Sequence, residues 1–192
     1  MRILLFDAVD SVVSAFREEP GLAAFEVIRV EMSELRGVAA VVSPANSFGF
    51  MDGGIDDVME LRWPGIQARV QLEIESDWHG ELPVGCAFAV ETLDKGITHL
   101  ICAPTMRVPM ELPEGTINPY LAARAAVLAA RRAGLDSLAI PGLGTGAGGL
   151  PAAESARQIG IGIRDALRPP KRWASWQSAV SEHKRVQGAW AV

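Results

Sequence analysis

The chain has 192 residues, a length typical of one domain, and 49% of them are apolar while 21% are charged. Its mean hydropathy of +0.18 indicates a full-sized core and excludes disorder for the bulk of the chain. The net charge of −5 argues against non-specific binding to nucleic-acid backbones, which relies on a basic surface.

No apolar run approaches the roughly 20 residues that span a bilayer, and the N-terminus carries an acid where a signal peptide would still be apolar. We therefore expect a cytoplasmic protein that has no membrane partner. Cys86 and Cys102, the only cysteines, lie in apolar strand-like segments and are expected to be buried thiols.

Short apolar runs alternate with helix-like patterns, as in an α/β layer structure. We expect strands at 2–8, 25–30, 38–44, 86–90, 98–103 and 137–141, and helices at 11–19, 55–78, 118–134 and 151–167. Trp63-Pro64-Gly65 is expected to divide the long helical stretch in two. Asn118 is expected to cap the clearest helix, with Pro119 at its first position.

The composition changes after Leu167. Residues 168–192 hold five basic residues, one acidic residue and three of the five tryptophans. We therefore divide the chain into a layered domain, residues 1–167, and a basic, tryptophan-rich C-terminal arm, residues 168–192. The arm's Trp173, Trp176 and Trp190 are expected to pack on the domain or at an oligomer interface rather than to stack on bases.

Two loops are unusual because each follows a buried strand and precedes a helix. The first, SPANSFGFMDGGID, covers residues 43–56 and is far longer than chain reversal requires. The second, PGLGTGAGGLP, covers residues 141–151 and holds five glycines. Ligands bind outside the carboxyl ends of strands in open α/β sheets, and glycines let backbone N–H groups converge on an anion. The two loops therefore predict a ligand site, with phosphate favoured near the helix that Pro151 begins.

Two nucleotide motifs are rejected for the second loop. Residues 144–149 match G-x-G-x-x-G formally, but no strand ending in an acid follows about 20 residues later, as a dinucleotide site requires. A P-loop needs Lys followed by Ser or Thr after the glycines, where Leu150 and Pro151 stand. A flexible linker or tight helix–strand packing is the remaining structural alternative.

Taken together, the SPAN strand end, the GGID segment and the second glycine loop resemble the macro domain family over roughly residues 25–167. The resemblance implies a three-layer α/β/α fold with a mixed central sheet. It also implies binding of ADP-ribose or a related nucleotide in a cleft between the two loops, with no cofactor. In the branch of the family with a G-G-V-D segment, it implies hydrolysis of ADP-ribosyl or O-acetyl-ADP-ribose esters.

The resemblance assigns roles to particular residues. Asn46 would hold the distal ribose and Asp56 would orient or activate water near the anomeric carbon, which makes these two the candidate catalytic residues. Glu31 would accept from the adenine amine. The candidate ligand-binding set is Glu31, Ala45, Asn46, Phe50, Gly53, Gly54, Ile55, Gly144, Thr145, Gly146, Ala147 and Gly148.

Several positions depart from the family pattern. Met51 and Asp52 replace glycines and are expected to add bulk and charge beside the ligand, unless Asp52 points away, pairs with Arg107 or contacts a cation. Ser43 replaces the first asparagine of the N-A-A-N pattern, and Gly148 replaces an aromatic residue. Phe48 and Phe50 are candidates for the missing stacking surface. Neither loop holds a lysine, which disfavours the branch that works through a covalent lysine adduct.

Other interpretations remain open at this point. The protein could be a non-catalytic ADP-ribose reader that binds an ADP-ribosylated macromolecule, or its pocket could serve another nucleotide. Asp56 could simply favour the start of a helix, Asn46 could turn the loop, and Glu31 and Arg107 could be surface charges. The histidines and cysteines lack zinc-ligand spacing, and Mg²⁺ at Asp52, Asp56 and Asp57 is a minor alternative.

Overall fold

A computed structural model describes residues 1–188, which form a three-layer α/β/α fold around a six-stranded sheet. The strands are β1 (Arg2–Asp7), β2 (Glu26–Arg29), β3 (Ala40–Ser43), β4 (Phe88–Glu91), β5 (His99–Cys102) and β6 (Ser137–Ile140). Their order is β2-β1-β6-β3-β5-β4. Only the β4–β5 pair is antiparallel, so the sheet is mixed, as expected.

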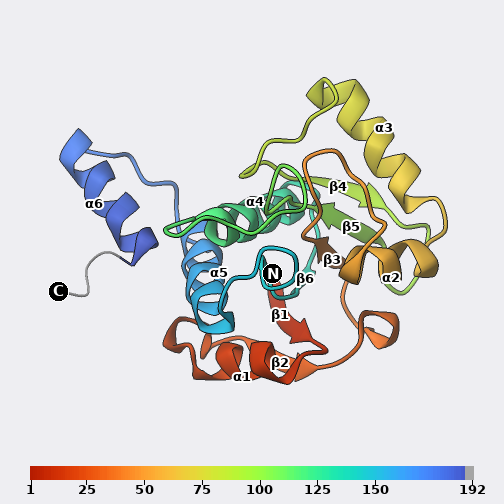
Figure 1. Ribbon diagram of the computed structural model, residues 1–192, viewed down its shortest axis with the longest axis horizontal. Helices are drawn as coiled ribbons and strands as arrows, with labels where there is room; N and C mark the ends of the chain where they lie inside the picture. The colour runs from red at the N-terminus through yellow and green to blue at the C-terminus, as the bar shows by residue number, and fades with distance from the viewer. Residues whose placement is uncertain (189–192) are drawn as a thin grey trace.

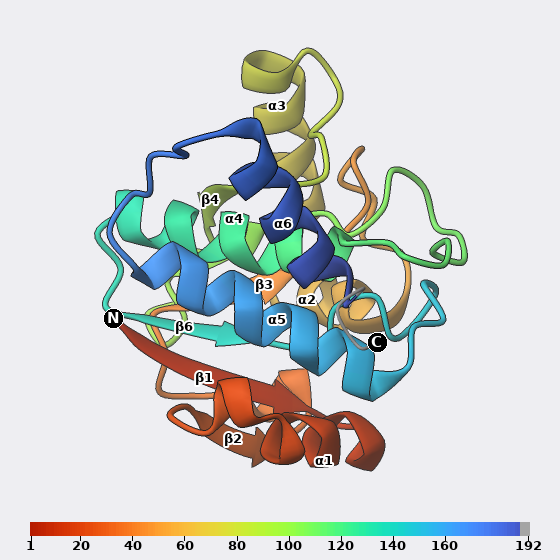
Figure 2. The same cartoon turned by 90° about the vertical axis from the view of Figure 1, so that its left-hand side faces the viewer.

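Helices cover both faces of the sheet (Figures 1 and 2). The helices are α1 (Asp10–Glu18), α2 (Gly54–Arg62), α3 (Ile66–Trp78), α4 (Asn118–Arg132), α5 (Ala152–Leu167) and α6 (Trp176–Gln187). Apolar side chains of α1, α4 and α5 share one core with one face of the sheet, and those of α2 and α3 share a second core with the other face. The carboxyl ends of the parallel strands therefore meet at one edge between two helical layers.

The middle strands β3 and β6 are buried along their whole length, as expected for the apolar runs of residues 40–42 and 138–140 that they contain. The long helical stretch divides at Trp63-Pro64-Gly65 into α2 and α3, as predicted. The cap of α4 was predicted wrongly: Ile117 is the N-cap, and the Asn118 side chain instead donates to the Thr105 carbonyl at 2.8 Å. This bond ties α4 to the loop after β5.

The C-terminal arm forms a helix, α6, that is attached to α5 near its own end. Val186 is buried, Arg157 donates to its carbonyl at 2.7 Å, and Arg185 pairs with Asp165 at 3.0 Å. Trp176 is 78% exposed and Trp173 is 42% exposed, so neither is covered by the domain, and packing at an oligomer interface stays a prediction. Trp173 precedes α6 and Trp176 is its first residue. Trp190 lies outside the described residues.

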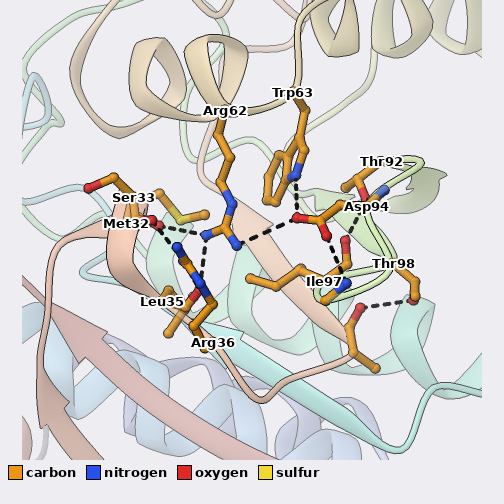
Figure 3. A network of polar contacts seen from close by, with 12 residues as sticks. Met32, Ser33, Leu35, Arg36, Arg62, Trp63, Thr92, Asp94, Ile97 and Thr98 are labelled. Atoms are coloured by element: carbon orange, nitrogen blue, oxygen red, sulfur yellow. Dashed lines mark hydrogen bonds and ion pairs between the residues drawn. The ribbon is translucent and has the colours of Figure 1, made fainter.

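A polar network fastens the segment after β2 to α2 (Figure 3). Arg62, at the end of α2, donates to the carbonyls of Met32 and Leu35 at 2.9 and 3.0 Å. Asp94 accepts from the Trp63 indole at 3.0 Å and pairs with Arg62 at 3.5 Å. The short turn of 3₁₀-helix at Met32–Glu34 is thereby held beside α2, and Glu31 sits at its start.

The two cysteines lie in different surroundings. Both are free thiols, as predicted, but Cys102 is buried whereas Cys86 is only partly buried, so the expectation that both are buried is wrong for Cys86. Over residues 1–188, none of the helices combines the length and the apolar character that crossing a membrane would require.

Candidate ligand-binding cleft

A cavity of about 640 Å³ opens at the carboxyl ends of β1, β3 and β6, and both predicted loops line it. It is lined by every residue of the predicted ligand set and by Asp56, although these residues come from three segments far apart in the sequence. This convergence occurs because the sheet order places β6, which leads into the second loop, directly beside β3, which leads into the first. The cavity has the size of a small-molecule site.

Asp56 lies in the first turn of α2 and is only 8% exposed, yet it lines the cleft. Its Oδ1 accepts a hydrogen bond from the Ser43 hydroxyl at 2.5 Å. Burial raises the pKa of Asp56 from its ordinary 3.8 to about 7, because a charged carboxylate loses its hydration there, and the Ser43 bond opposes this rise. Asp56 can therefore exchange a proton near neutral pH.

Asn46 uses most of its hydrogen-bonding capacity inside the first loop. Its Oδ1 accepts from the backbone N–H groups of Phe48 and Phe50 at 3.1 and 3.3 Å, and its Nδ2 donates to the Phe50 carbonyl at 2.8 Å. An amide nitrogen carries two hydrogens, so one N–H of Asn46 remains for a ligand. Asn46 thus shapes the loop and can still donate into the cleft.

The second loop presents unpaired backbone donors. Within the described chain, the N–H groups of residues 144–148 donate to no protein acceptor, and Gly144 has the positive φ of +76° that lets the chain fold back on itself. The Leu150 N–H closes the loop on the Gly144 carbonyl at 3.0 Å. A run of N–H groups without protein acceptors, in the loop that leads into α5, is suited to bind an anion.

The cleft contains acidic side chains but no basic ones among the described residues that line it. The lining carboxyls are Asp7, Glu31, Asp52 and Asp56, and no Lys, Arg or His joins them. Any anionic group bound here must therefore be held by uncharged donors, backbone N–H groups and hydroxyls, rather than by cationic side chains of the described residues. Described residues also form no group of three or more side chains suited to hold a metal ion.

The sequence around the cleft matches that of a known protein family. Residues 42–159 match the sequence profile of the Macro domain family, a span that includes both loops. The chain belongs to the macro domain family. An uncharacterized protein of Aeropyrum pernix is 36% identical over 138 residues, which cover 70% of this chain and 69% of that protein.

Solved macro domains share the fold at low sequence identity. The macrodomain of Mycobacterium tuberculosis DarG has a TM-score of 0.60 at 19% identity and covers 86% of this chain and 92% of that one. A mutant Oceanobacillus iheyensis macrodomain, solved with ADP-ribose, has a TM-score of 0.58 at 20% identity and covers 69% and 73%. The three-layer arrangement expected from the sequence is therefore that of macro domains.

The residues that depart from the family pattern lie differently from expectation. Met51 is buried in the core beneath α2 and α3, so the bulk expected beside the ligand is absent from this macro domain's cleft. Asp52 lines the cleft and is exposed to solvent. Arg107 does not pair with Asp52; its guanidinium binds Glu81 at 2.7 Å and lies over the Phe48 ring. Phe50 is 52% exposed at the cleft and is the aromatic available for stacking.

Two further walls of the cleft were not predicted. Asp7, at the end of β1, lines the cleft and accepts from the Gly142 N–H at 3.1 Å, which fixes the start of the second loop. The connection between β5 and α4 contributes Thr105 and Met106, and its Leu112 N–H donates to the Gly148 carbonyl at 2.9 Å. A signal was available, since both segments follow buried strands, as the two glycine loops do.

Gly148 is expected to be the least replaceable glycine of the second loop. A Cβ added there would lie 2.5 Å from the Gly144 carbonyl oxygen, so the backbone would have to shift. We expect Gly148→Ala to lower the free energy of unfolding by about 1–3 kcal/mol, as overpacking does. The control is Gly146→Ala, whose Cβ would meet nothing within 4 Å and should cost less than about 0.5 kcal/mol. Urea unfolding of both variants is the measurement, and equal losses would contradict this account of the loop.

Proposed function

We propose that this macro domain binds ADP-ribose or a derivative in the cleft and hydrolyses ADP-ribosyl or O-acetyl-ADP-ribose esters. The observation that carries the proposal is the meeting of free backbone donors and the buried Asp56 carboxyl in one cavity of about 640 Å³. The ADP-ribose complex of the Oceanobacillus iheyensis macrodomain supports the choice of ligand.

In the proposed complex, each part of the ligand meets a group suited to it. The pyrophosphate would accept from the N–H groups of residues 144–148, which have no protein acceptor within the described chain. Glu31 would accept from the adenine amine, and the remaining N–H of Asn46 would donate to a hydroxyl of the distal ribose. Phe50 offers its exposed ring as a stacking surface.

Asp56 would carry the chemistry. When ionised, its carboxylate can accept a proton from a water molecule that attacks the ester carbon or the anomeric carbon, and it can stabilise the positive charge that develops on the ribose. Its pKa of about 7 matches this task, because a base works best when its pKa lies near the operating pH. The proton then leaves Asp56 for the departing group or solvent.

A non-catalytic ADP-ribose reader is the second candidate. One observation favours it: Asp56 is only 8% exposed and its Oδ1 is bonded to Ser43, so the carboxyl can serve to fasten α2 to the end of β3 rather than to activate water. In this case an ADP-ribosylated macromolecule would be recognised through the same contacts and released unchanged.

The ligand is tested by calorimetric titration of the full chain with ADP-ribose, with AMP as the control. We expect one site, with ADP-ribose bound more tightly than AMP, because AMP lacks the distal phosphate and ribose that the second loop and Asn46 would contact. Absence of heat at millimolar ADP-ribose would overturn the proposed ligand.

A further inference from the structure

Ser43 donates a hydrogen bond to the side chain of Asp56, and it does not itself line the cleft. It is the last residue of β3, is fully buried, and pairs in register with Cys102 of β5. Its backbone is therefore fixed by strand pairing within the sheet. Its hydroxyl contacts Asp56 from the end of β3.

The Ser43 hydrogen bond distinguishes the two carboxyl oxygens of Asp56. Oδ1 accepts the hydroxyl at 2.5 Å, whereas Oδ2 accepts no hydrogen bond from the described residues. Because Ser43 holds Oδ1, rotation of the carboxyl about its last bond is restricted. Oδ2 is then the oxygen left for a group inside the cleft.

We propose that Ser43 is a positioning residue, whose hydroxyl anchors Oδ1 of Asp56 so that Oδ2 faces the substrate or its attacking water. The proposal rests on the proposed hydrolysis for its effect on turnover, but the anchoring itself concerns the free protein. A serine is suited to this position because its hydroxyl is short and the space at the end of β3 is fully enclosed.

The other titratable groups around Asp56 do not replace this contact. Cys102, on the neighbouring strand, is buried, and burial followed by the Asp56 charge raises the pKa of its thiol, so it stays neutral throughout the working range. The remaining carboxyls of the cleft are Asp7, Glu31 and Asp52. Asp7 is engaged by the N–H groups of Val9 and Gly142, and none of the three shares a hydrogen bond with Asp56. Ser43 is therefore the side chain through which the fold controls this carboxyl.

The test follows the carboxyl carbon of Asp56 by NMR across pH in the free protein. The variants are Ser43→Ala, which removes the donor, and Ser43→Thr, which keeps it. The control is Ser137→Ala, another buried serine, whose hydroxyl bonds the Ala39 N–H at the opposite end of the sheet. We expect Ser43→Ala to move the Asp56 titration upward by roughly one unit or more, since a hydrogen bond to a charged group is lost. Ser43→Thr and Ser137→Ala should leave it near the wild-type value.

The same variants are then compared in turnover of an ADP-ribosyl ester. In Ser43→Ala, the increase of kcat with pH should occur at higher pH, because a smaller fraction of Asp56 is ionised at a given pH. The variant should also lower kcat more than it changes KM, because the carboxylate is less well oriented. An unmoved carboxyl titration in Ser43→Ala, or an equal shift in Ser43→Thr, would overturn the anchoring role. If the wild type cleaves no ester, hydrolysis fails as a function, while the titration still decides whether Ser43 holds Asp56.

Discussion

Replacing Asp56 with asparagine is expected to lower the rate of ADP-ribosyl ester hydrolysis by about 10²- to 10⁴-fold, the usual effect of losing a positioned general base. Asparagine keeps the shape of the side chain and an oxygen that can accept from Ser43, but it cannot take a proton from water. Release of ADP-ribose from a glutamate-linked ADP-ribosyl protein, followed over time, is the measurement. Affinity for ADP-ribose should be kept, because Asp56 is not one of the predicted phosphate contacts.

The matched control for this variant is Asp57→Asn. Asp57 is the next residue in the same first turn of α2 but is exposed to solvent, so its loss should change the rate little. The wild-type rate should also rise with pH through about 7, as Asp56 ionises. Equal rates for wild type and Asp56→Asn would exclude Asp56 as the base, and a wild type that binds but does not cleave would favour the reader.

The same carboxyl is expected to make the protein less stable as pH rises. Its pKa in the folded state, about 7, lies above the ordinary 3.8 that applies when the chain is unfolded. The folded state therefore holds the proton more tightly, so this contribution to stability is fully present below pH 3.8 and is lost as pH rises through 7. About three pKa units correspond to roughly 4 kcal/mol between these limits.

Urea unfolding at a series of pH values from about 4 to 8.5 measures this effect. Asp56→Asn does not titrate, so its stability relative to the wild type should increase by roughly 4 kcal/mol across the range, while ionisation elsewhere cancels in the difference. Asp57→Asn, exposed on the same turn, should run parallel to the wild type. Parallel curves for Asp56→Asn and the wild type would mean that Asp56 titrates normally in the folded protein.

The cleft could be predicted from the sequence because each of the two loops has an unusual composition or length that can be recognised without the rest of the chain. The glycines of residues 141–151 and the long polar stretch after β3 mark strand ends that were not built for simple turns. The break at Trp63-Pro64-Gly65 was equally local, since proline ends a helix by its own geometry. The macro domain resemblance then supplied the pairing of the two loops, which local patterns cannot.

The features that escaped prediction depend on contacts between distant segments. Asp7 gains its role only because β1 lies beside β6, an order that hydrophobic patterns do not encode. Met51 follows an exposed phenylalanine and precedes an exposed aspartate, yet it turns into the core, and nothing in the local sequence fixes that direction. Trp176 shows the reverse case: it does not pack on the domain, and of the two expected coverings only an oligomer interface stays a prediction.

ADP-ribose is expected to bind between the two loops. Amide chemical-shift mapping during a titration of the full chain with ADP-ribose shows directly where it binds. We predict that the largest shifts occur at the backbone N–H groups of residues 144–148 and at Gly53 and Gly54, because these donors line the cleft. Amides of α6, which do not line it, should stay in place. Shifts confined to other surfaces, or none at millimolar ligand, would contradict the account.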